Sequence, residues 1–141
     1  MVSCSGDENE VEITVPSSEL PERATNFLKE YFYDYPISKV EKESANGLII
    51  YEVYLEEGYE VVFNSEGYWQ QVDAPYGKTI PFEIIPEPIQ QTLKDRFYGY
   101  GVIEINTSGQ NYHLVLSDNQ GGASIDLLFN QSGEILSYGD M

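Results

Sequence analysis

Acidic side chains are the groups of this sequence with the widest choice of chemistry. The chain of 141 residues holds 24 Asp and Glu against 7 Lys and Arg, which gives a net charge of −17. Glu52 and Glu60 lie in neighbouring alternating runs, and if they face each other across a hairpin, the pair would either raise a carboxyl pKa or bind a cation. No calcium loop with regularly spaced Asp and Asn occurs. The sequence therefore predicts no cofactor and leaves weak calcium binding open.

Nucleophiles and nitrogen ligands are scarce. His113 is the only histidine, so a histidine metal site or a catalytic triad would have to be built around it. Its place in an alternating run is typical of an ordinary strand residue. No serine lies in a nucleophile elbow, and no glycine-rich phosphate loop occurs. We expect a protein that is not an enzyme and has no catalytic residues.

The charge excludes some partners. A net charge of −17 repels nucleic acid phosphates and anionic membrane surfaces. It suits a cationic partner or loosely bound cations. The sequence has no apolar run of about 18 residues, so it predicts no membrane-spanning helix.

Two alternating runs flank the acidic turn Glu56-Glu57-Gly58 and predict antiparallel strands. On one face of these strands every side chain is apolar or aromatic, which indicates a face that packs on a core. These residues are Tyr51, Val53, Leu55, Tyr59, Val61 and Phe63. The opposite face mixes apolar and acidic side chains, which favours a surface that meets a partner. Strand propensity alone remains the alternative explanation for its apolar members.

A similar mixed face is expected near the C-terminus. The predicted partner-binding residues on the two faces are Ile50, Glu52, Tyr54, Glu60, Val62, Val115, Asp126 and Leu128. The carboxylates among them would select a cationic partner.

An internal repeat relates the two halves of the chain. Leu20-Pro21-Glu22 matches Ile85-Pro86-Glu87, and the run 51–55 matches the run 112–116. Phe63-Asn64 likewise matches Phe129-Asn130. The lengths of the two copies differ only in predicted turns, as expected of a structural repeat.

The pattern predicts an α+β fold made of a tandem repeat, in which each copy is a helix followed by a four-stranded antiparallel sheet. We expect residues 1–17 to be a disordered acidic tether, in which only Val11 to Val15 could form a short edge strand, and residues 18–75 and 81–139 to be the two repeats of one compact unit. The natural boundary between the halves is the loop 74–78.

Helix limits are read from serine and proline. The first helix is expected to open at Ser17-Ser18 and to end at Tyr35-Pro36, because the residue before proline avoids the helical region. The second helix is expected to run from Pro86 to Phe97.

The single cysteine lies in the N-terminal tail and excludes an internal disulfide. Val2-Ser3-Cys4 is similar to the end of a bacterial lipobox, although Met1 stands where leucine is usual. We interpret Cys4 as a lipidation site whose signal segment is missing from this chain, which would place the protein in the periplasm or at the outer-membrane surface. An ordinary free thiol is the alternative.

Several motifs together resemble those of the PepSY-like family, also described as β-lactamase-inhibitor-like, of envelope proteins from gut Bacteroidetes. The motifs are Leu20-Pro21-Glu22, Tyr35-Pro36, the runs 51–55 and 58–63, Gly67-Tyr68-Trp69, Val72-Asp73, and their second copies at 85–87, 112–116 and 129–133. The resemblance implies helices on one face of an extended, curved antiparallel sheet, and secretion, often as a lipoprotein. It supplies no catalytic residues. The second copy departs from the pattern, since Tyr100-Gly101 replaces Tyr35-Pro36.

The leading hypothesis is a non-catalytic binding module of the cell envelope that holds a protein or peptide on its open sheet face. The resemblance raises two alternatives, which are inhibition of a secreted or periplasmic enzyme of the peptidase or β-lactamase type, and a calcium-responsive periplasmic protein. A homodimer that closes the mixed face is a further possibility.

Overall fold

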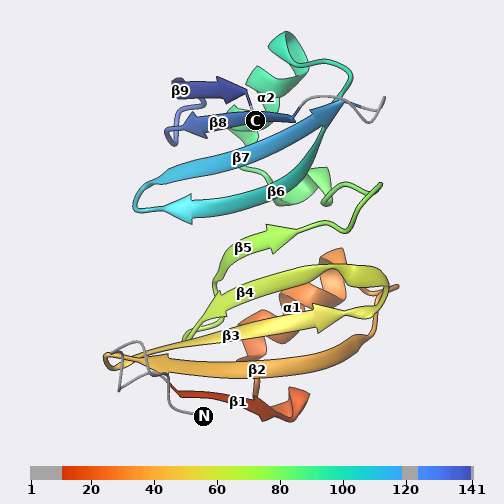
Figure 1. The fold of residues 1–141 in the computed structure, drawn as a ribbon, viewed down its shortest axis with the longest axis vertical. Coiled ribbons are helices and arrows are strands. Elements are labelled where there is room, and N and C mark those ends of the chain that lie inside the picture. Colours follow the sequence, from red (N-terminus) through yellow and green to blue (C-terminus); the bar gives the residue numbers. More distant parts are fainter. Residues whose placement is uncertain (1–10, 119–123, 141) are drawn as a thin grey trace. The chain divides into compact units, whose positions relative to one another are not determined.

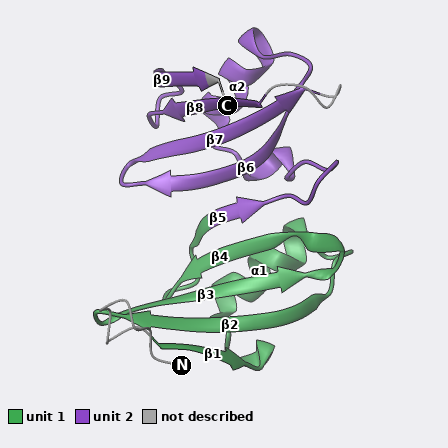
Figure 2. Ribbon diagram, viewed as in Figure 1, with its two compact units in different colours: residues 1–70 green, residues 71–141 purple. Residues whose placement is uncertain are grey.

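The computed structural model describes residues 11–118 and 124–140 of the chain. The chain forms two compact units, Met1–Gln70 and Gln71–Met141 (Figure 2). The boundary falls inside a strand, not in the loop 74–78 that the sequence indicated. The reason is that Gln71, Val72 and Asp73 pair with the next strand along the chain and so belong with the second unit.

The first unit holds one α-helix and a sheet in sequential strand order (Figure 1). Its elements are β1 (Val11–Val15), α1 (Glu22–Tyr31), β2 (Ile37–Ala45), β3 (Leu48–Leu55) and β4 (Glu60–Asn64), with 3₁₀ turns at Ser17–Glu19 and Glu56–Gly58. The strand pairs β1–β2, β2–β3 and β3–β4 are antiparallel. The alternating runs of the sequence are therefore strands, as predicted.

The second unit has the same kinds of element. Strand β5 (Trp69–Asp73) crosses the boundary, and the elements that follow are a 3₁₀ turn at Phe82–Ile84, α2 (Glu87–Arg96), β6 (Tyr100–Ser108), β7 (Asn111–Asp118), β8 (Ser124–Phe129) and β9 (Ile135–Asp140). The strand pairs from β5–β6 to β8–β9 are antiparallel. The described residues thus form a mostly antiparallel sheet with two α-helices.

The predicted core is correct. Phe63 and Val61 are fully buried, and Tyr51 has an exposed fraction of only 8%. The ring of Phe27 on α1 lies 5.5 Å from that of Phe63 at 84°, so α1 covers this face of its sheet. Leu114, Leu127 and Phe129 are fully buried in the second unit.

Both helices begin and end differently from the predictions. Ser17–Glu19 forms a 3₁₀ turn, and Pro21 with ψ of 148° then caps a helix that starts at Glu22. Proline suits this position because its missing N–H has no acceptor there. The helix ends at Tyr31, well before Pro36, because Phe32 leaves the helical region with φ of −136°.

The end of α2 follows the same rule. The sequence indicated that Phe97 belongs to the last turn of α2. It is instead the C-cap, with φ of −129°. In each unit a phenylalanine therefore leaves the helix where the chain turns toward the next strand.

The predicted tether is wrong for residues 11–17. Residues 11–15 form β1, which pairs with β2, and Val15 is buried against the core. Residues 1–10, including Cys4, lie outside the described residues, so the lipidation site stays a prediction.

Matching turns position the strands in both units. The side-chain Oδ1 of Asn64 accepts hydrogen bonds from the backbone N–H groups two and four residues further on, and Oδ1 of Asn130 does the same. Gly67 and Gly133 follow them with φ of 92° and 87°. A side chain at either glycine would meet the helix of its unit, since a Cβ would lie 2.9 Å from Ala24 N in one and 2.4 Å from Pro88 O in the other.

Candidate binding surface

The outer face of the first unit is the sheet face opposite α1. Strand register sets its rows: Ile50 lies between Glu43 and Asn64, Glu52 lies between Glu41 and Val62, and Tyr54 lies between Lys39 and Glu60. All the predicted binding residues of this unit, namely Ile50, Glu52, Tyr54, Glu60 and Val62, lie together on this face and are half-buried.

The predicted pairing of Glu52 with Glu60 is wrong. The turn Glu56–Gly58 closes the hairpin so that Tyr54 faces Glu60 and Glu52 faces Val62. The carboxylate opposite Glu52 comes from the other neighbouring strand, where Glu41 is its partner across β2 and β3.

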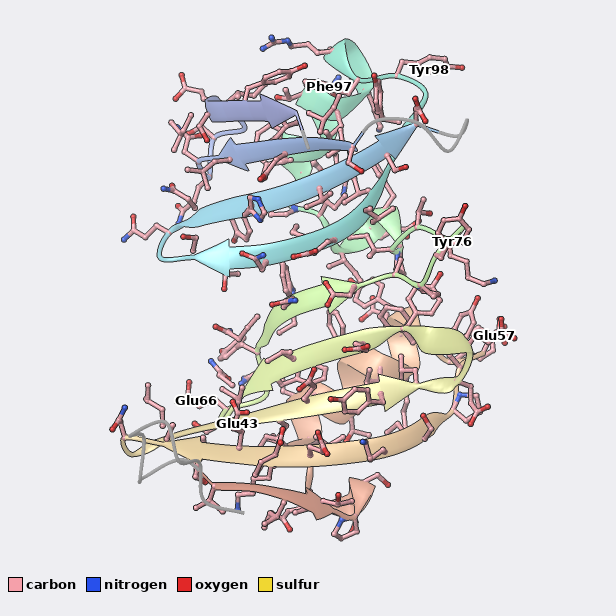
Figure 3. All side chains as sticks on the ribbon, viewed as in Figure 1. Glu43, Glu57, Glu66, Tyr76, Phe97 and Tyr98 are labelled. Carbon is pink, nitrogen blue, oxygen red and sulfur yellow. The ribbon has the colours of Figure 1, made fainter. Side chains whose placement is uncertain are left out.

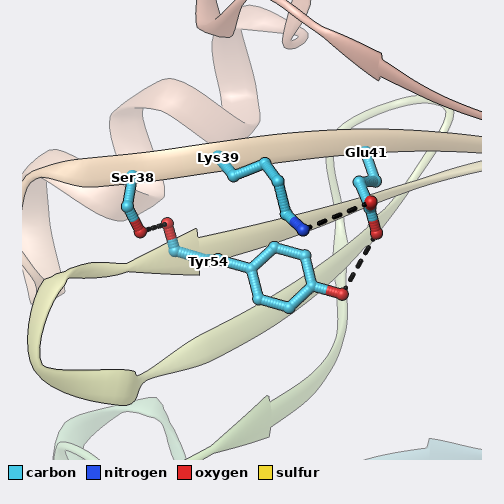
Figure 4. Close-up of polar contacts among 4 residues, drawn as sticks. All are labelled: Ser38, Lys39, Glu41 and Tyr54. Atoms are coloured by element: carbon cyan, nitrogen blue, oxygen red, sulfur yellow. Dashed lines mark hydrogen bonds and ion pairs between the residues drawn. The ribbon is translucent and has the colours of Figure 1, made fainter.

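Tyr54 is the centre of a polar cluster that Figure 4 shows. Its hydroxyl donates to Glu41 Oε1 at 3.2 Å, and Lys39 Nζ lies 3.3 Å from Glu41 Oε2. The ammonium of Lys39 also lies 4.6 Å from the centre of the Tyr54 ring, within range of a cation–π interaction. Ser38 donates its hydroxyl to the backbone carbonyl of Tyr54 at 3.0 Å.

Burial raises the pKa of the Tyr54 hydroxyl above its ordinary value, and the neighbouring charges of Glu52 and Glu41 raise it further. The physical reason is that a phenolate would be poorly hydrated and repelled by two carboxylates. Tyr54 is therefore a hydrogen-bond donor on this face at any physiological pH.

Three carboxylates converge beside this cluster. Oxygen atoms of Glu12, Glu41 and Glu52 lie within 4.8 Å of one another, supplied by β1, β2 and β3. Like charges at this separation repel, so the group favours a cation that approaches from outside. Oxygen ligands of this kind suit a hard cation such as calcium.

An open hollow of about 350 Å³ lies at the hairpin end of the same unit. It is lined by Gly47, Leu48, Ile49, Ile50, Asn64, Ser65 and Gln70. Leu48 has an exposed fraction of 74%, high for a large apolar side chain. Figure 3 labels Glu43 and Glu66 at this end of the sheet, and Glu43 lies opposite Ile50 in the strand register.

The outer face of the second unit has a different chemistry. Its register joins Glu104, Val115 and Asp126 in one row, and Asn106, His113 and Leu128 in the next. Asp126 and Leu128 are half-buried, as a surface role requires, whereas Val115 is buried with an exposed fraction of 7%.

Polar groups of this second face bond to one another. His113 Nε2 pairs with Asp126 Oδ1, and Asn106 Nδ2 lies 3.3 Å from His113 Nδ1. Asn106 also lies 3.3 Å from Glu104 Oε2. A histidine and an amide thus hydrogen-bond to the acidic groups here, and His113 is part of a strand network.

Glu12, Lys39, Glu41 and Glu43 also lie on the first face, although they are not among the predicted binding residues. The stretch Ser38 to Ser44 alternates around the buried Val40, and this signal could have placed Lys39, Glu41 and Glu43 on one side. Only strand pairing could bring Glu12 to them, because it lies on β1.

In the described part of the chain, no helix is long and apolar enough to cross a membrane.

Comparison with known proteins identifies the relatives of this chain. The family model described as "Putative beta-lactamase-inhibitor-like, PepSY-like" matches residues 49–137. No curated protein matches the sequence.

Solved structures from Bacteroides share the fold. One from Bacteroides vulgatus, described as a "putative periplasmic protein of unknown function", has a TM-score of 0.80 at 26% identity and covers 93% of this chain and 99% of its own. One from Bacteroides thetaiotaomicron, described as a "putative calcium-regulated periplasmic protein", has a TM-score of 0.81 at 24% identity and covers 91% and 96%. A third, from Bacteroides vulgatus, has a TM-score of 0.82 at 20% identity.

Proposed function

Since the chain belongs to the PepSY-like, β-lactamase-inhibitor-like family, we propose that it is a non-catalytic binding module of the bacterial cell envelope. It works in the periplasm or at the outer-membrane surface, in keeping with relatives described as periplasmic. Its partner is a protein or peptide that docks on the outer face of the first unit.

One observation carries this proposal. The face presents half-buried Ile50, Tyr54 and Val62 beside the carboxylates of Glu41 and Glu52. Apolar and aromatic groups within an acidic surround are what a cationic protein surface would complement. No catalytic role is assigned to any residue, and no cofactor is required for this function.

We also propose that the two units are copies of one repeat, each a helix followed by four strands. The matching Asn64 and Asn130 turns, with their glycines packed under α1 and α2, support a common ancestor. The second unit then keeps the scaffold while its outer face has diverged.

The test is capture of a partner from native envelope extract with the full chain as bait. The double variant Tyr54→Ala/Val62→Asp removes an aromatic group and adds a charge on the outer face. Tyr33→Ala is the matched control, because Tyr33 is 78% exposed beyond the end of α1. We expect one partner to be held by the wild type and by Tyr33→Ala, and lost by the double variant.

Retention of the partner by the double variant would show that the outer face of the first unit is not the docking surface. No partner together with a dimer in solution would instead support closure of the face by a second copy. Circular dichroism and the urea midpoint of each variant ensure that loss of binding is not loss of folding.

A calcium-responsive protein is the second candidate. The convergence of Glu12, Glu41 and Glu52 within 4.8 Å favours it, and a relative of similar fold is described as calcium-regulated. Calorimetry with millimolar calcium tests it, with Glu52→Gln as the variant that removes one ligand. Absence of calcium heat from the wild type would end this candidate.

Inhibition of a secreted or periplasmic enzyme is a special case of the binding function, suggested by the description of the family. A panel of peptidases and β-lactamases with purified protein tests it. If no enzyme of the panel is inhibited, enzyme inhibition is excluded for that panel, and the binding function is left with a partner of another kind.

A further inference from the structure

We propose that Asn46 is a site of spontaneous covalent modification, at which the side-chain amide is lost and the residue becomes a mixture of aspartate and isoaspartate. The site lies in the turn between β2 and β3. The reaction needs only water, so it is independent of the binding function proposed above.

The chemistry takes place at the bond between Asn46 and Gly47. The backbone nitrogen of Gly47 attacks the side-chain carbonyl carbon of Asn46 and gives its proton to water or hydroxide, while Nδ2 takes up a proton and leaves as ammonia. The new bond between nitrogen and carbon closes a succinimide ring. Water then opens the ring at either carbonyl carbon, which gives aspartate or isoaspartate, and in isoaspartate the main chain runs through the former side chain.

The sequence favours this position over every other asparagine. Of the asparagines in the chain, only Asn46 is followed by glycine. Ring closure brings the backbone of the following residue against the asparagine side chain. Glycine hinders this approach least, because it has no Cβ and its backbone is the least restricted.

The turn leaves the attacking nitrogen accessible. The ladder between β2 and β3 closes at the pair Ala45 and Leu48, so the amides of Asn46 and Gly47 lie outside it. Asn46 and Gly47 are both exposed, with φ of 53° and 81°. A Cβ placed on Gly47 would meet no described residue within 4 Å, so the described part of the chain does not crowd the closing ring.

Asn64 is the matched site that the fold protects. Its Oδ1 accepts hydrogen bonds from the backbone N–H groups of Glu66 and Tyr68, each at 3.0 Å. Attack by the nitrogen of Ser65 would require the side chain to rotate and break both bonds. Asn130 is held in the same way in the second unit.

Modification would change both the charge and the geometry of the hairpin end. Either product carries a carboxylate in place of a neutral amide, and isoaspartate also lengthens the main chain by about one bond. The length of a tight turn sets the register of its strands, so the longer chain cannot keep Ala45 opposite Leu48. Gly47 and Leu48 also line the hollow at this end, whose shape would change with the turn.

Peptide mapping of the full chain after ageing in mildly alkaline buffer tests the modification. Trypsin releases residues 43–78 as one peptide that holds both Asn46 and Asn64, so fragmentation compares the two sites in the same molecule. Each conversion adds about one mass unit, and isoaspartyl methyltransferase labels the isoaspartate. We expect Asn46 of the folded protein to convert at least about tenfold faster than Asn64, and Gly47→Ala to slow its conversion by about tenfold or more.

The same mapping in urea separates the effect of sequence from that of the fold. Asn64 should convert faster once its hydrogen bonds are lost, and its rate should rise by a larger factor than that of Asn46. Equal rates at the two sites in the folded protein, or conversion of Asn46 only in urea, would overturn the proposal. An unchanged rate in Gly47→Ala would overturn it as well.

Asn46→Asp distinguishes the added charge from the lengthened chain, because aspartate is well tolerated in a turn and keeps the normal backbone. We expect amide hydrogen exchange of residues 43–50 to be at least about tenfold faster in aged wild-type protein than in freshly prepared Asn46→Asp. Equal exchange in the two samples would show that the strand pairing survives, and would overturn the predicted opening of the hairpin end.

Discussion

The outer faces of the two units occupy equivalent strands but arrange charge in opposite ways. On the first, Glu12, Glu41 and Glu52 gather around Tyr54 with Lys39 as their neighbouring cation. On the second, His113 and Asn106 bond to the acidic groups of their own face. The first face thus brings carboxylates of three strands together, whereas the acidic groups of the second are hydrogen-bonded to a histidine and an amide.

The inner, buried faces of the two sheets are, by contrast, nearly alike. Phe63 and Phe129 occupy the same place and are both fully buried, and each unit closes a strand turn with asparagine and glycine. Core packing restricts volume and shape, whereas a solvated face is free to vary. The difference between the units therefore lies in their outer faces and not in their cores.

The largest expected effect tests the likeness of the cores. Phe63→Ala and Phe129→Ala should each lower the free energy of unfolding by about 3–5 kcal/mol, because a cavity replaces a buried ring. Phe63→Ala should cost more, by about 0.5–1.5 kcal/mol, since its ring meets Phe27 edge-on at 5.5 Å. Urea denaturation measures both, with Tyr33→Ala as the neutral control. A larger loss for Phe129→Ala would contradict the stated role of the aromatic pair.

The two turn glycines give the next largest effect. Gly133→Ala should destabilise more than Gly67→Ala, both by about 2–3 kcal/mol, because the new Cβ would meet a carbonyl oxygen at 2.4 Å in one and an N–H nitrogen at 2.9 Å in the other. Gly109→Ala separates strain from collision, since Gly109 has φ of 64° with open space around it. It should cost only about 1 kcal/mol in the same urea experiment. Equal losses at all three positions would mean that the helix contacts contribute nothing.

Alkaline pH distinguishes the first outer face from the second. The pKa of Tyr54 is raised in the folded protein, so above about pH 10 the unfolded chain loses this proton while the folded chain keeps it. Stability should therefore fall as pH rises through this range. Tyr54→Phe should make this fall of stability with pH less steep. Part of the fall remains in the variant because burial also raises the pKa of Tyr59. Urea midpoints between about pH 8 and pH 11, the range of ordinary tyrosine titration, measure this pH dependence. Equal slopes for wild type and Tyr54→Phe would contradict the placement of the Tyr54 hydroxyl among carboxylates.

The smallest effect is the sharpest test of the charge comparison. Removing one charge should stabilise the first unit and destabilise the second. Glu52→Gln relieves repulsion from Glu12 and Glu41, whereas Asp126→Asn weakens the pair with His113. Each change should amount to about 0.2–1 kcal/mol and should shrink in high salt, because these groups are partly exposed. If both variants change stability in the same direction, the two faces do not differ in the proposed way.

Much of the fold could be predicted from the sequence because the core follows local rules. The alternation from Tyr51 to Leu55 fixed which side chains face the helix, and all of those positions are buried. The dipeptide Asn46-Gly47 is itself a hairpin-turn signal, and both residues have positive φ in the structure. The helix ends were not predicted, because the helix starts only after Pro21 and stops at Phe32, whose φ of −136° no local pattern indicated.

The binding surface was predicted only in part. Periodicity placed Glu52, Tyr54 and Val62 on one face correctly, but it paired Glu52 with Glu60, which instead lies opposite Tyr54. Register depends on the geometry of the turn between two strands, and a shift of this kind changes every neighbour without changing the face.

By itself, the sequence determined the strands on either side of the Glu56–Gly58 turn and their buried side, the acidic character and the family resemblance, because these depend on residue type and on spacing along the chain. The tertiary structure alone decided which carboxylates meet. Glu12, Glu41 and Glu52 lie on different strands, and only the order and register of β1, β2 and β3 bring their oxygens within 4.8 Å. Side chains distant in sequence become neighbours through hydrogen bonds between backbones, and no periodicity within a single strand records that pairing.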